Sequence, residues 1–423
     1  MDDNLLSEMR EYSCRTVGPV VYAYAEWIVK EAVQRGIGKV YFLARDGYLP
    51  CEAARMICSD RGIALECRYL YCSRASLRLP TYGLSREEAR RHLFCGGYCV
   101  SARSILSRVG LDESRMRDII DRLNINEIDK TLNKAEQKHI FEALDGDGLF
   151  WKYVLDESST AYAATLSYLR AEGLFDSDTV AIADSGWSGS MQRSLRILLH
   201  SGGYDGRILG FYFGLYRLPR DPLDGEYFTY YFSARHGILR RALFCNNLFE
   251  CMLSAPHPTT VGYRITGDGV TPVFGRRYSD AMLALIKAQI SGALMFCIKE
   301  KHKISAKNEA ETRRECFRIL RRAMILPTKS DARLYAHFLF CDEVSECGMR
   351  PLTCSDASAN IPDNLFFTRL FRRLTRRTAH SNGAPFWIYG DIASLRGVRK
   401  FWFLFNALLW DVLKSLRDSA RRK

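Results

Sequence analysis

The sequence lacks several of the patterns that assign a function directly. None of its 14 cysteines forms a Cys-x-x-Cys pair, and the nearest spacing, Cys95 to Cys99, has no second pair to complete a zinc site. There is no Walker A loop, no His-Glu-x-x-His stretch and no Ser/His/Asp arrangement. These absences argue against the enzyme classes that such motifs mark. The scattered cysteines predict reduced, mostly buried thiols rather than disulfides.

Long apolar runs are also missing. No stretch reaches the roughly 20 apolar residues that a transmembrane helix needs. The N-terminal segment MDDNLLSEMREYSCR is acidic and polar, without the apolar region of a signal peptide. Apolar residues make up 47% and charged residues 26% of the 423-residue chain, which is an ordinary globular composition. We therefore expect a cytoplasmic protein of roughly two to three domains.

Positive charge is concentrated near the C-terminus. The net charge is +13, but residues 364–423 hold 13 Lys/Arg and three acidic residues, a net of +10, which leaves +3 for the other 363 residues. In this tail, residues 366–377 (FFTRLFRRLTRR) interleave aromatic residues with arginines, and residues 398–413 are rich in Trp and Phe. One interpretation is peripheral contact with the inner face of a membrane. The alternative is a helix packed on the protein with a solvated basic face. Nucleic-acid binding is disfavoured because no recognisable motif accompanies the charge.

Alternating strand and helix patterns predict a parallel sheet. Residues 19–36 have helical apolar spacing, residues 40–44 form a short apolar run, and CEAARMICSDRG continues as a helix that ends at Gly62. A second strand within ALECRYLYCSRAS completes a βαβ unit. The pattern resumes at DTVAIADSGWSGSMQRSLRILL as strand, turn and helix, and RILGFYFGLY is the next strand. The prediction is an α/β fold of the Rossmann-like type.

Residues 82–172 interrupt this alternation with charged, helix-favouring segments, and they predict a helical insertion. Residues 1–81 and 173–275 would then form one discontinuous α/β domain that binds a phosphorylated ligand. From 276 to 423 the pattern is helical again and ends in the basic tail.

The strongest local pattern is VAIADSGWSGSM, residues 180–191. An apolar strand is expected to end at Asp184, and open α/β sheets bind ligands at the carboxyl ends of their strands. The following helix would direct unpaired N–H groups and the positive end of its dipole at the turn, which favours phosphate. Glycines allow close backbone approach. The predicted ligand contacts are Ser185, Gly186, Trp187, Ser188, Gly189 and Ser190. An ordinary capped turn is the alternative.

Two other strand ends carry polar residues. Arg45, Asp46 and Gly47 follow the first strand, and Ser73 and Arg74 follow the second. Arginine can grip phosphate with two hydrogen bonds, and an aspartate can accept hydroxyls or hold Mg²⁺. Because parallel strands end on one edge of a sheet, these groups are expected to converge with Asp184 on a site for a phosphorylated small molecule.

Further candidates for proton transfer lie in NNLFECMLSAPHPTTVGY. Asp46 and Asp184 are the first catalytic candidates, and Glu250 and His257 join them from this segment. A histidine in a proline-rich loop can act as a general acid or base near neutral pH, but it can equally be a structural loop residue.

Two family resemblances are carried by the same residues. GPVVYAYAEWIVKEAVQRGIGKVYFLARDGYLP, YLYCSRAS, IADSGWSGSMQRSL and SAPHPTTVGY resemble the region downstream of the phosphatase-like module in predicted HAD-superfamily proteins of surface-polysaccharide gene clusters. The resemblance spans roughly residues 15–270. The Asp-x-Asp nucleophile motif of the HAD phosphatases is absent, so their hydrolase activity is not carried over.

The second resemblance is to phosphoribosyltransferases. DTVAIADSGWSGSMQRSL is similar to their phosphoribosyl-diphosphate loop, and FLARDGYLPCEAA is similar to an earlier strand–loop–helix that touches diphosphate. It implies that Asp184 takes ribose hydroxyls while Ser188, Gly189 and Ser190 take phosphate. Those enzymes usually have two adjacent acids, whereas Ser185 follows Asp184 here.

Together the resemblances imply a transferase that acts on an activated sugar phosphate in surface-polysaccharide biosynthesis, with Mg²⁺ as a candidate cofactor held by Asp46. Two alternatives stay open. One is a non-catalytic nucleotide- or sugar-phosphate-binding partner of polysaccharide enzymes, and the other is a nucleotide-sugar glycosyltransferase.

Overall fold

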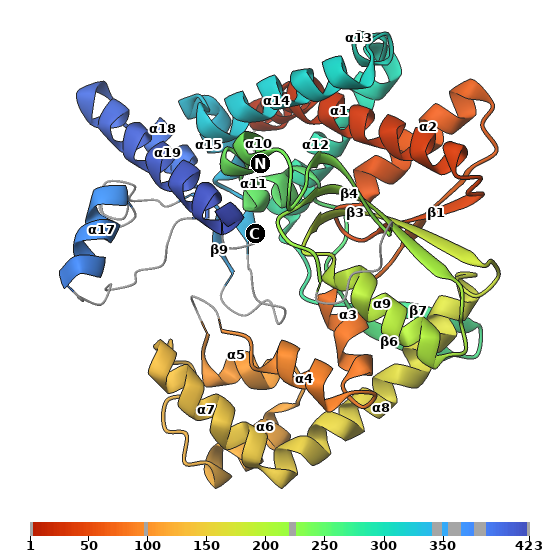
Figure 1. The fold of residues 1–423 in the computed structure, drawn as a ribbon, viewed down its shortest axis with the longest axis vertical. Coiled ribbons are helices and arrows are strands. Elements are labelled where there is room, and N and C mark those ends of the chain that lie inside the picture. Colours follow the sequence, from red (N-terminus) through yellow and green to blue (C-terminus); the bar gives the residue numbers. More distant parts are fainter. Residues whose placement is uncertain are drawn as a thin grey trace.

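The computed structural model describes residues 3–96, 100–219, 226–340, 349–353, 365–375 and 386–420. A five-stranded sheet lies in the middle of the molecule, with helices α4 to α7 at one end and α1, α12 and α14 at the other (Figure 1). Helices α17 to α19 lie to one side. The predicted α/β class with a parallel sheet is confirmed.

The sheet is entirely parallel, and its strands are ordered β2-β1-β3-β4-β5. The strands are β1 (Lys39–Leu43), β2 (Glu66–Leu70), β3 (Thr179–Trp187), β4 (Arg207–Leu215) and β5 (Tyr227–Phe232). The first four coincide with strands expected from the sequence. The strand order reverses between β1 and β3, because β2 lies outside β1 while β4 and β5 extend the sheet on the other side of β3.

Both faces of the sheet are buried, as expected for parallel strands. Val40, Phe42 and Ala183 face one core, which they share with α1, α2 and α12. Tyr41 and Ile182 face the opposite core, which they share with α9 and the C-terminal half of α8. The helices of these layers are α1 (Asp3–Gln34), α2 (Tyr48–Arg61), α8 (Gly148–Ala171), α9 (Ser190–Ser201) and α12 (Asp280–Lys299). Ligand access to the sheet is therefore confined to the ends of the strands.

The first helix is longer than the sequence pattern predicts. α1 begins at Asp3, so Pro19 lies inside it rather than at its start. Proline inside a helix removes a hydrogen bond and usually breaks the helix, but packing can compensate. Here α1 crosses α12 at a very short distance, because a Cβ added at Gly292 would lie 2.1 Å from the carbonyl oxygen of Arg10, and one at Gly18 would also collide with α12. This contact between distant segments accounts for the extra length.

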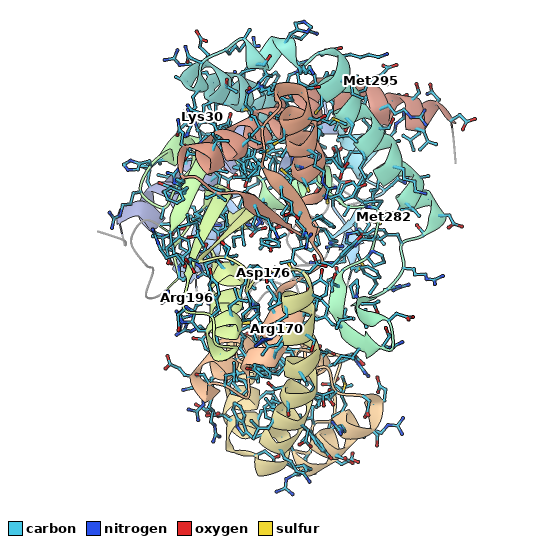
Figure 2. All side chains as sticks on the ribbon, turned by 90° about the vertical axis from the view of Figure 1, so that its right-hand side faces the viewer. Lys30, Arg170, Asp176, Arg196, Met282 and Met295 are labelled. Atoms are coloured by element: carbon cyan, nitrogen blue, oxygen red, sulfur yellow. The ribbon has the colours of Figure 1, made fainter. Side chains whose placement is uncertain are left out.

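Among the described residues, α12 is the one helix long and apolar enough to cross a membrane. The expectation that no segment reaches this length is therefore wrong for residues 280–299. Half of the apolar stretch is buried inside the protein. Figure 2 shows α12 beside α1, with Met282 buried and Met295 at the outer surface. Gln289 on its buried side donates to the carbonyl oxygen of Cys251 and accepts from the hydroxyl of Tyr335. We interpret α12 as a core helix.

The helices expected in residues 82–172 are present and have a hydrophobic core of their own, which includes Tyr82, Leu93, Ile105 and Val154. α8 belongs to two cores, because its first half packs here and its second half packs on the sheet. The elements here are α4 (Arg86–Leu93), α5 (Ala102–Ser107), α6 (Glu113–Arg122) and α7 (Lys134–Gly146), and they are preceded by α3 (Arg74–Arg78) and the 3-10 helix η1 (Leu79–Thr81). The domain boundaries themselves stay a prediction.

The remaining segments are mainly helical, as expected from residue 276 onward. Before them lie α10 (Ile238–Ala242), α11 (Asn246–Met252) and an antiparallel hairpin of β6 (Thr260–Thr266) and β7 (Gly269–Phe274). The C-terminal elements are α13 (His302–Ser305), α14 (Glu309–Ile325), α15 (Lys329–Tyr335), β8 (Leu339–Phe340), β9 (Arg350–Pro351), α17 (Phe366–Thr375), α18 (Ile388–Ala393) and α19 (Gly397–Ala420). The basic residues at 376–377 and 421–423 lie outside the described residues.

Candidate functional site

β3 extends farther than the sequence pattern predicts. Asp184 is expected to end the strand, but β3 continues to Trp187 and pairs with β4 over these last residues. β1 stays alongside β3 only as far as the pair Phe42–Ala183. Asp184 and the residues after it therefore project past the end of β1. This is the point where the strand order reverses, which is where open parallel sheets bind ligands.

Three carboxyl groups meet at this edge. Asp46 lies in the turn after β1, Asp184 on β3 and Glu250 on α11. Burial is the largest cause that raises the pKa of each. Charge repulsion adds to it, because Asp46 raises the pKa of both other acids and Glu250 raises that of Asp184. The three acids therefore form one electrostatically connected cluster, as the sequence predicts for Asp46 and Asp184.

Glu250 has the pKa best suited to proton transfer. Burial raises its pKa to about 7, and the Asp46 carboxyl acts in the same direction. Trp187 Nε1 donates a 2.6 Å hydrogen bond to Oε1 of Glu250, which, together with the charges of Arg74 and Arg45, opposes the rise without cancelling it. A carboxyl group with this pKa can take up and release a proton at neutral pH. The Trp187 ring lies in a cluster with Tyr216, Phe232, Phe244 and Phe249.

Asp46 interacts with the hydroxyl of Ser185 and with the charges of two arginines. The hydroxyl of Ser185, which is 4% exposed, donates to Oδ2 of Asp46. Burial raises the pKa of Asp46, while this hydrogen bond and the charges of Arg45 and Arg74 lower it. Arg45 in turn donates from Nη1 to the hydroxyl of Tyr278 over 2.9 Å. The two predicted arginines thus lie at the carboxylate cluster, and Ser185 orients Asp46.

The predicted phosphate turn is largely engaged with the protein itself. The backbone amides of Ser185 and Gly186 hydrogen-bond the carboxyl of Asp184 and lower its pKa against the effect of burial. The amide of Ser188 donates to the carbonyl oxygen of Gly186 over 3.1 Å. Gly186 has φ +110°, and a Cβ there would lie 2.4 Å from the carbonyl oxygen of Gly214. Glycine is needed here for the close packing of β3 on β4.

Two other predicted glycine contacts also serve packing. Gly189 precedes α9 with φ +62°, and a Cβ there would lie 2.9 Å from Cε1 of Tyr227. Gly47 precedes α2, and a Cβ there would lie 2.5 Å from the carbonyl oxygen of Leu43. No side chain caps the amino end of α9 at Gly189, so the predicted phosphate contact of its first amides stays a prediction.

Ser73 and His257 are held by the scaffold. Ser73 caps α3 by accepting from two amides, and its hydroxyl donates to the carbonyl oxygen of Thr260 over 2.6 Å. His257 Nδ1 contacts the carbonyl oxygen of Pro258 at 2.7 Å, and Nε2 lies 2.7 Å from the hydroxyl of Tyr69. Burial lowers the pKa of His257. With a partner on each nitrogen, this histidine fits the structural alternative better than a proton-transfer role.

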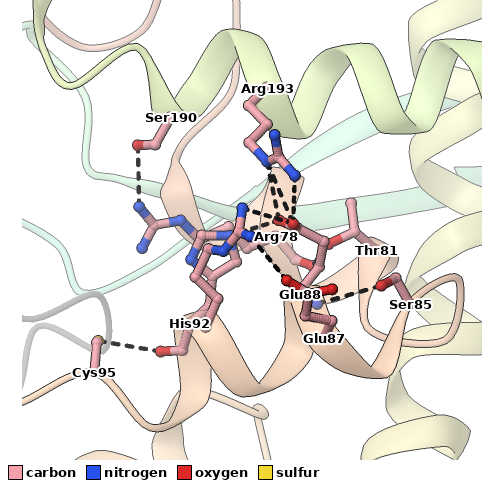
Figure 3. A network of polar contacts seen from close by, with 10 residues as sticks. Arg78, Thr81, Ser85, Glu87, Glu88, His92, Cys95, Ser190 and Arg193 are labelled. Carbon is pink, nitrogen blue, oxygen red and sulfur yellow. Dashed lines mark hydrogen bonds and ion pairs between the residues drawn. The ribbon is translucent and has the colours of Figure 1, made fainter. Parts of the chain in front are cut away.

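Arg78 is a site residue that the sequence reasoning missed. Its Nη2 donates to the hydroxyl of Ser190 at the start of α9 over 3.2 Å (Figure 3). Its Nε is buried and has no hydrogen-bond partner. Burial and the positive charge of Arg74, four residues earlier on α3, lower the pKa of Arg78 to about 10. The pair of arginines one helical turn apart in RASLR was the available signal.

Glu88, which Figure 3 shows in the same polar network, is already neutralised. Glu88 on α4 is 5% exposed and pairs with Arg193 at 2.7 Å and with Arg91 at 2.8 Å. The neighbouring His92 has its pKa lowered to about 3 by burial and by nearby arginines, including Arg78. Positive charge therefore dominates at the amino end of α9, which is the setting that binds an anion.

The predicted Mg²⁺ site is not built from protein groups alone. In the described part of the chain, no group of three His, Cys, Asp or Glu side chains is placed to hold a metal ion. Mg²⁺ is often held by one or two carboxylates with the remaining positions filled by water and substrate phosphates. Asp46 fits only this second kind of site.

A cavity of about 550 Å³ lies at the opposite edge of the sheet, by the amino ends of β1, β3 and β4. Its basic residues are Arg35, Lys39 and Arg207, of which Arg35 pairs with Glu31 at 2.5 Å and Lys39 with Glu66 at 3.3 Å. Since two of these three charges are neutralised, the carboxyl edge, with its cluster of acids and arginines, is the better candidate site.

Comparisons with known proteins assign no family. No protein-family model matches the chain, and no curated protein matches its sequence.

Proposed function

We propose that the chain is a transferase that acts on an activated sugar phosphate and releases phosphate or diphosphate. The observation that carries this proposal is the raised pKa of Glu250 beside the two aspartates. Its pKa of about 7 makes it a proton acceptor at neutral pH, and it lies within electrostatic reach of both carboxylates and two arginines. Carboxyl groups with a pKa near neutrality cluster at catalytic sites, where they transfer protons.

The site has an acidic part and a basic part, which fit the two parts of such a substrate. Asp184 and Asp46 can accept hydrogen bonds from sugar hydroxyls. Arg45, Arg74 and Arg78, with the first amides of α9, can hold phosphate groups. Arg74 joins the two parts, because its charge acts on Asp46, Glu250 and Arg78.

In the reaction, an acceptor X–H attacks the anomeric carbon of the sugar. The X–C bond forms, the bond from that carbon to the phosphate oxygen breaks, and the electron pair leaves with the phosphate. The acceptor's proton passes to the carboxylate of Glu250. The arginines stabilise the charge that develops on the leaving group, which is usually the largest contribution to catalysis. Mg²⁺, if used, would be held by Asp46 and phosphate oxygens and would supply additional positive charge.

The setting in surface-polysaccharide biosynthesis, in the cytoplasm, follows from the motif resemblance and is part of the proposal. The engaged amides of the turn and the single acid at position 184 favour a donor other than phosphoribosyl diphosphate within the same class. A non-catalytic sugar-phosphate-binding protein is the second candidate, and the missing adjacent acid supports it.

The test begins with thermal unfolding in the presence of phosphoribosyl diphosphate, pentose phosphates and nucleotide sugars, with and without Mg²⁺. A ligand at 100 times its Kd adds about 2.7 kcal/mol to the free energy of unfolding. The stabilising ligand is then incubated with candidate acceptors, and the release of diphosphate, phosphate or nucleoside diphosphate is measured. Nucleoside-diphosphate release would identify a nucleotide-sugar glycosyltransferase instead.

Asp184→Asn and Glu250→Gln distinguish catalysis from binding. We expect Glu250→Gln to lower turnover by about 10²–10⁴-fold while ligand stabilisation persists. The matched control is Glu172→Gln, a half-buried glutamate beside Arg68 near the other edge of the sheet. Ligand stabilisation without turnover in the wild type, weakened by Asp184→Asn, would support the binding protein and overturn the transferase.

A further inference from the structure

The outer side of the C-terminal helices carries a large exposed apolar surface. We call it the aromatic face, and it consists of Phe367, Leu370 and Phe371 on α17 and Val398, Phe401, Trp402 and Phe405 on α19. Val398 is 85% exposed and Phe401 is 72% exposed. The rings of Phe367 and Trp402 stack with centroids 5.7 Å apart, so the two helices form one continuous surface.

This exposure is not caused by a loosely attached helix. The opposite side of α19 is docked, with Phe403, Asn406 and Ser415 buried. Arg241 on α10 is also buried, and it donates from Nη2 to the carbonyl oxygen of Ser415 over 3.1 Å. α19 therefore has a buried apolar side and a second apolar stripe, at residues 398, 401, 402 and 405, that faces outward. A helix that is apolar on both sides is usually covered on both sides, by the rest of the protein or by a partner or membrane.

The segment that carries the aromatic face is strongly basic in sequence, because residues 364–423 contain 13 Lys/Arg and three acids. The structure describes the side chains of six of these basic residues, which are Arg369, Arg396, Arg399, Lys400, Lys414 and Arg417. The acids do little to offset this charge at the surface, because Asp391 is 2% exposed, Asp411 accepts a hydrogen bond from Tyr389, and Asp418 pairs with Arg417. Helices that lie in the interface of an anionic bilayer typically combine exposed aromatic residues with arginine and lysine, and their Trp side chains lie at the level of the headgroups.

We propose that the aromatic face docks on an anionic phospholipid bilayer, with Phe401, Trp402 and Phe405 inserted and the surrounding basic residues against lipid phosphates. A second copy of the chain is a poorer occupant, because the same face would bring two basic surfaces together. The inference shares no residue with the candidate site and does not depend on the proposed activity.

The experiment is flotation of the full chain with vesicles of phosphatidylcholine alone and of phosphatidylcholine with phosphatidylglycerol. We expect binding to the mixed vesicles only, weakened by salt because screening shortens the reach of the charges. Phe401→Ser/Trp402→Ser should weaken binding roughly 100-fold, since two aromatic side chains no longer leave water. The matched control is Val33→Ser/Ile298→Ser, which removes two other exposed apolar side chains, 51% and 62% exposed, from α1 and α12.

Further readouts separate the other occupants. Melting temperatures show that each variant is folded, and the fluorescence of Trp402, compared between wild type and Trp402→Phe, should shift to shorter wavelength on mixed vesicles. Wild-type protein that ignores the mixed vesicles, or a serine double variant that binds them as well as its control, would overturn the proposal. Two other results would also overturn it. One is a dimer in sedimentation that the double variant abolishes. The other is single-stranded nucleic acid that binds more tightly than vesicles and no longer binds to the double variant.

Discussion

The indole Nε1 of Trp187 donates a 2.6 Å hydrogen bond to Oε1 of Glu250, which is 63 residues away in the chain. This contact joins the end of β3 to α11 and aims a glutamate from outside the sheet at the two aspartates on its carboxyl edge. Trp187 reaches it with φ +71°, a left-handed conformation that is uncommon for a non-glycine residue. The arrangement holds a half-buried carboxyl group where its charged form is disfavoured.

Replacing this carboxyl should change the pH dependence of stability. The pKa of Glu250 is raised from 4.5 to about 7 on folding, so the folded state binds the proton more tightly than the unfolded chain. The stabilisation from this group is complete below its unfolded pKa and is lost as the pH rises through about 7. Glu250→Gln keeps an acceptor for Trp187 but carries no charge. We expect it to unfold like the wild type near pH ~4 and to be more stable by roughly 3 kcal/mol near pH ~8.

Urea unfolding at the two pH values measures this difference. Glu172→Gln serves as the control and should leave the wild-type pH dependence of the free energy of unfolding in place. Equal stability of Glu250→Gln and wild type at the higher pH would show that Glu250 ionises there at no cost, and the argument for a general base would lose its basis.

Arg78 should be important for anion binding and unimportant for folding. Its Nε is buried without a hydrogen-bond partner, and burial, together with the positive charges of Arg74 and Arg108, lowers its pKa to about 10. An anion at the start of α9 would relieve this repulsion. We expect pyrophosphate to raise the melting temperature of the wild type. Arg78→Met should weaken pyrophosphate binding by roughly 10–100-fold, the effect of losing one charge-assisted hydrogen bond, without lowering the melting temperature of the free protein.

The control for Arg78 is Arg318→Gln, which removes a 72% exposed arginine paired with Glu315 on α14. It should bind pyrophosphate like the wild type. If both variants lost the response equally, net charge and not a site at α9 would explain the binding.

The sequence predicted the part of the site that follows from strand ends. Asp46, Arg74 and Asp184 come together because parallel strands end on one edge of a sheet, and this follows from apolar runs alone. The role of each residue depends on partners elsewhere in the chain. The hydroxyl of Tyr69 holds His257 in place, and no local sequence pattern predicts this contact. Within the described part of the chain Arg78 forms no ion pair, whereas Arg193 and Arg91 both pair with Glu88.

Contacts between distant segments also explain where the fold prediction was wrong. Leu5, Met9 and Tyr12 recur at helical spacing before Pro19, but a proline is expected to start a helix, and the contact with α12 carries α1 through it. β3 extends to Trp187 because β4 offers Gly214 opposite Gly186, and a glycine on a neighbouring strand has no signal in the sequence of β3. Long-range packing decides both cases.

Gly186 gives the sharpest test of this packing. Its φ of +110° is strained for any side chain, and a Cβ would lie 2.4 Å from the carbonyl oxygen of Gly214 and 3.0 Å from Cδ1 of Tyr212. Backbone cannot move aside without breaking the β3–β4 pairing that positions Asp184. We expect Gly186→Ala to lower the free energy of unfolding by at least about 2 kcal/mol, measured by urea unfolding. Gly262→Ala in β6 is the matched control, because a Cβ there meets nothing within 4 Å, and it should have little effect. If Gly186→Ala were as stable as this control, β3 would not pack against β4 at Gly214 as described, and the position of Asp184 beside Asp46 and Glu250 would be wrong.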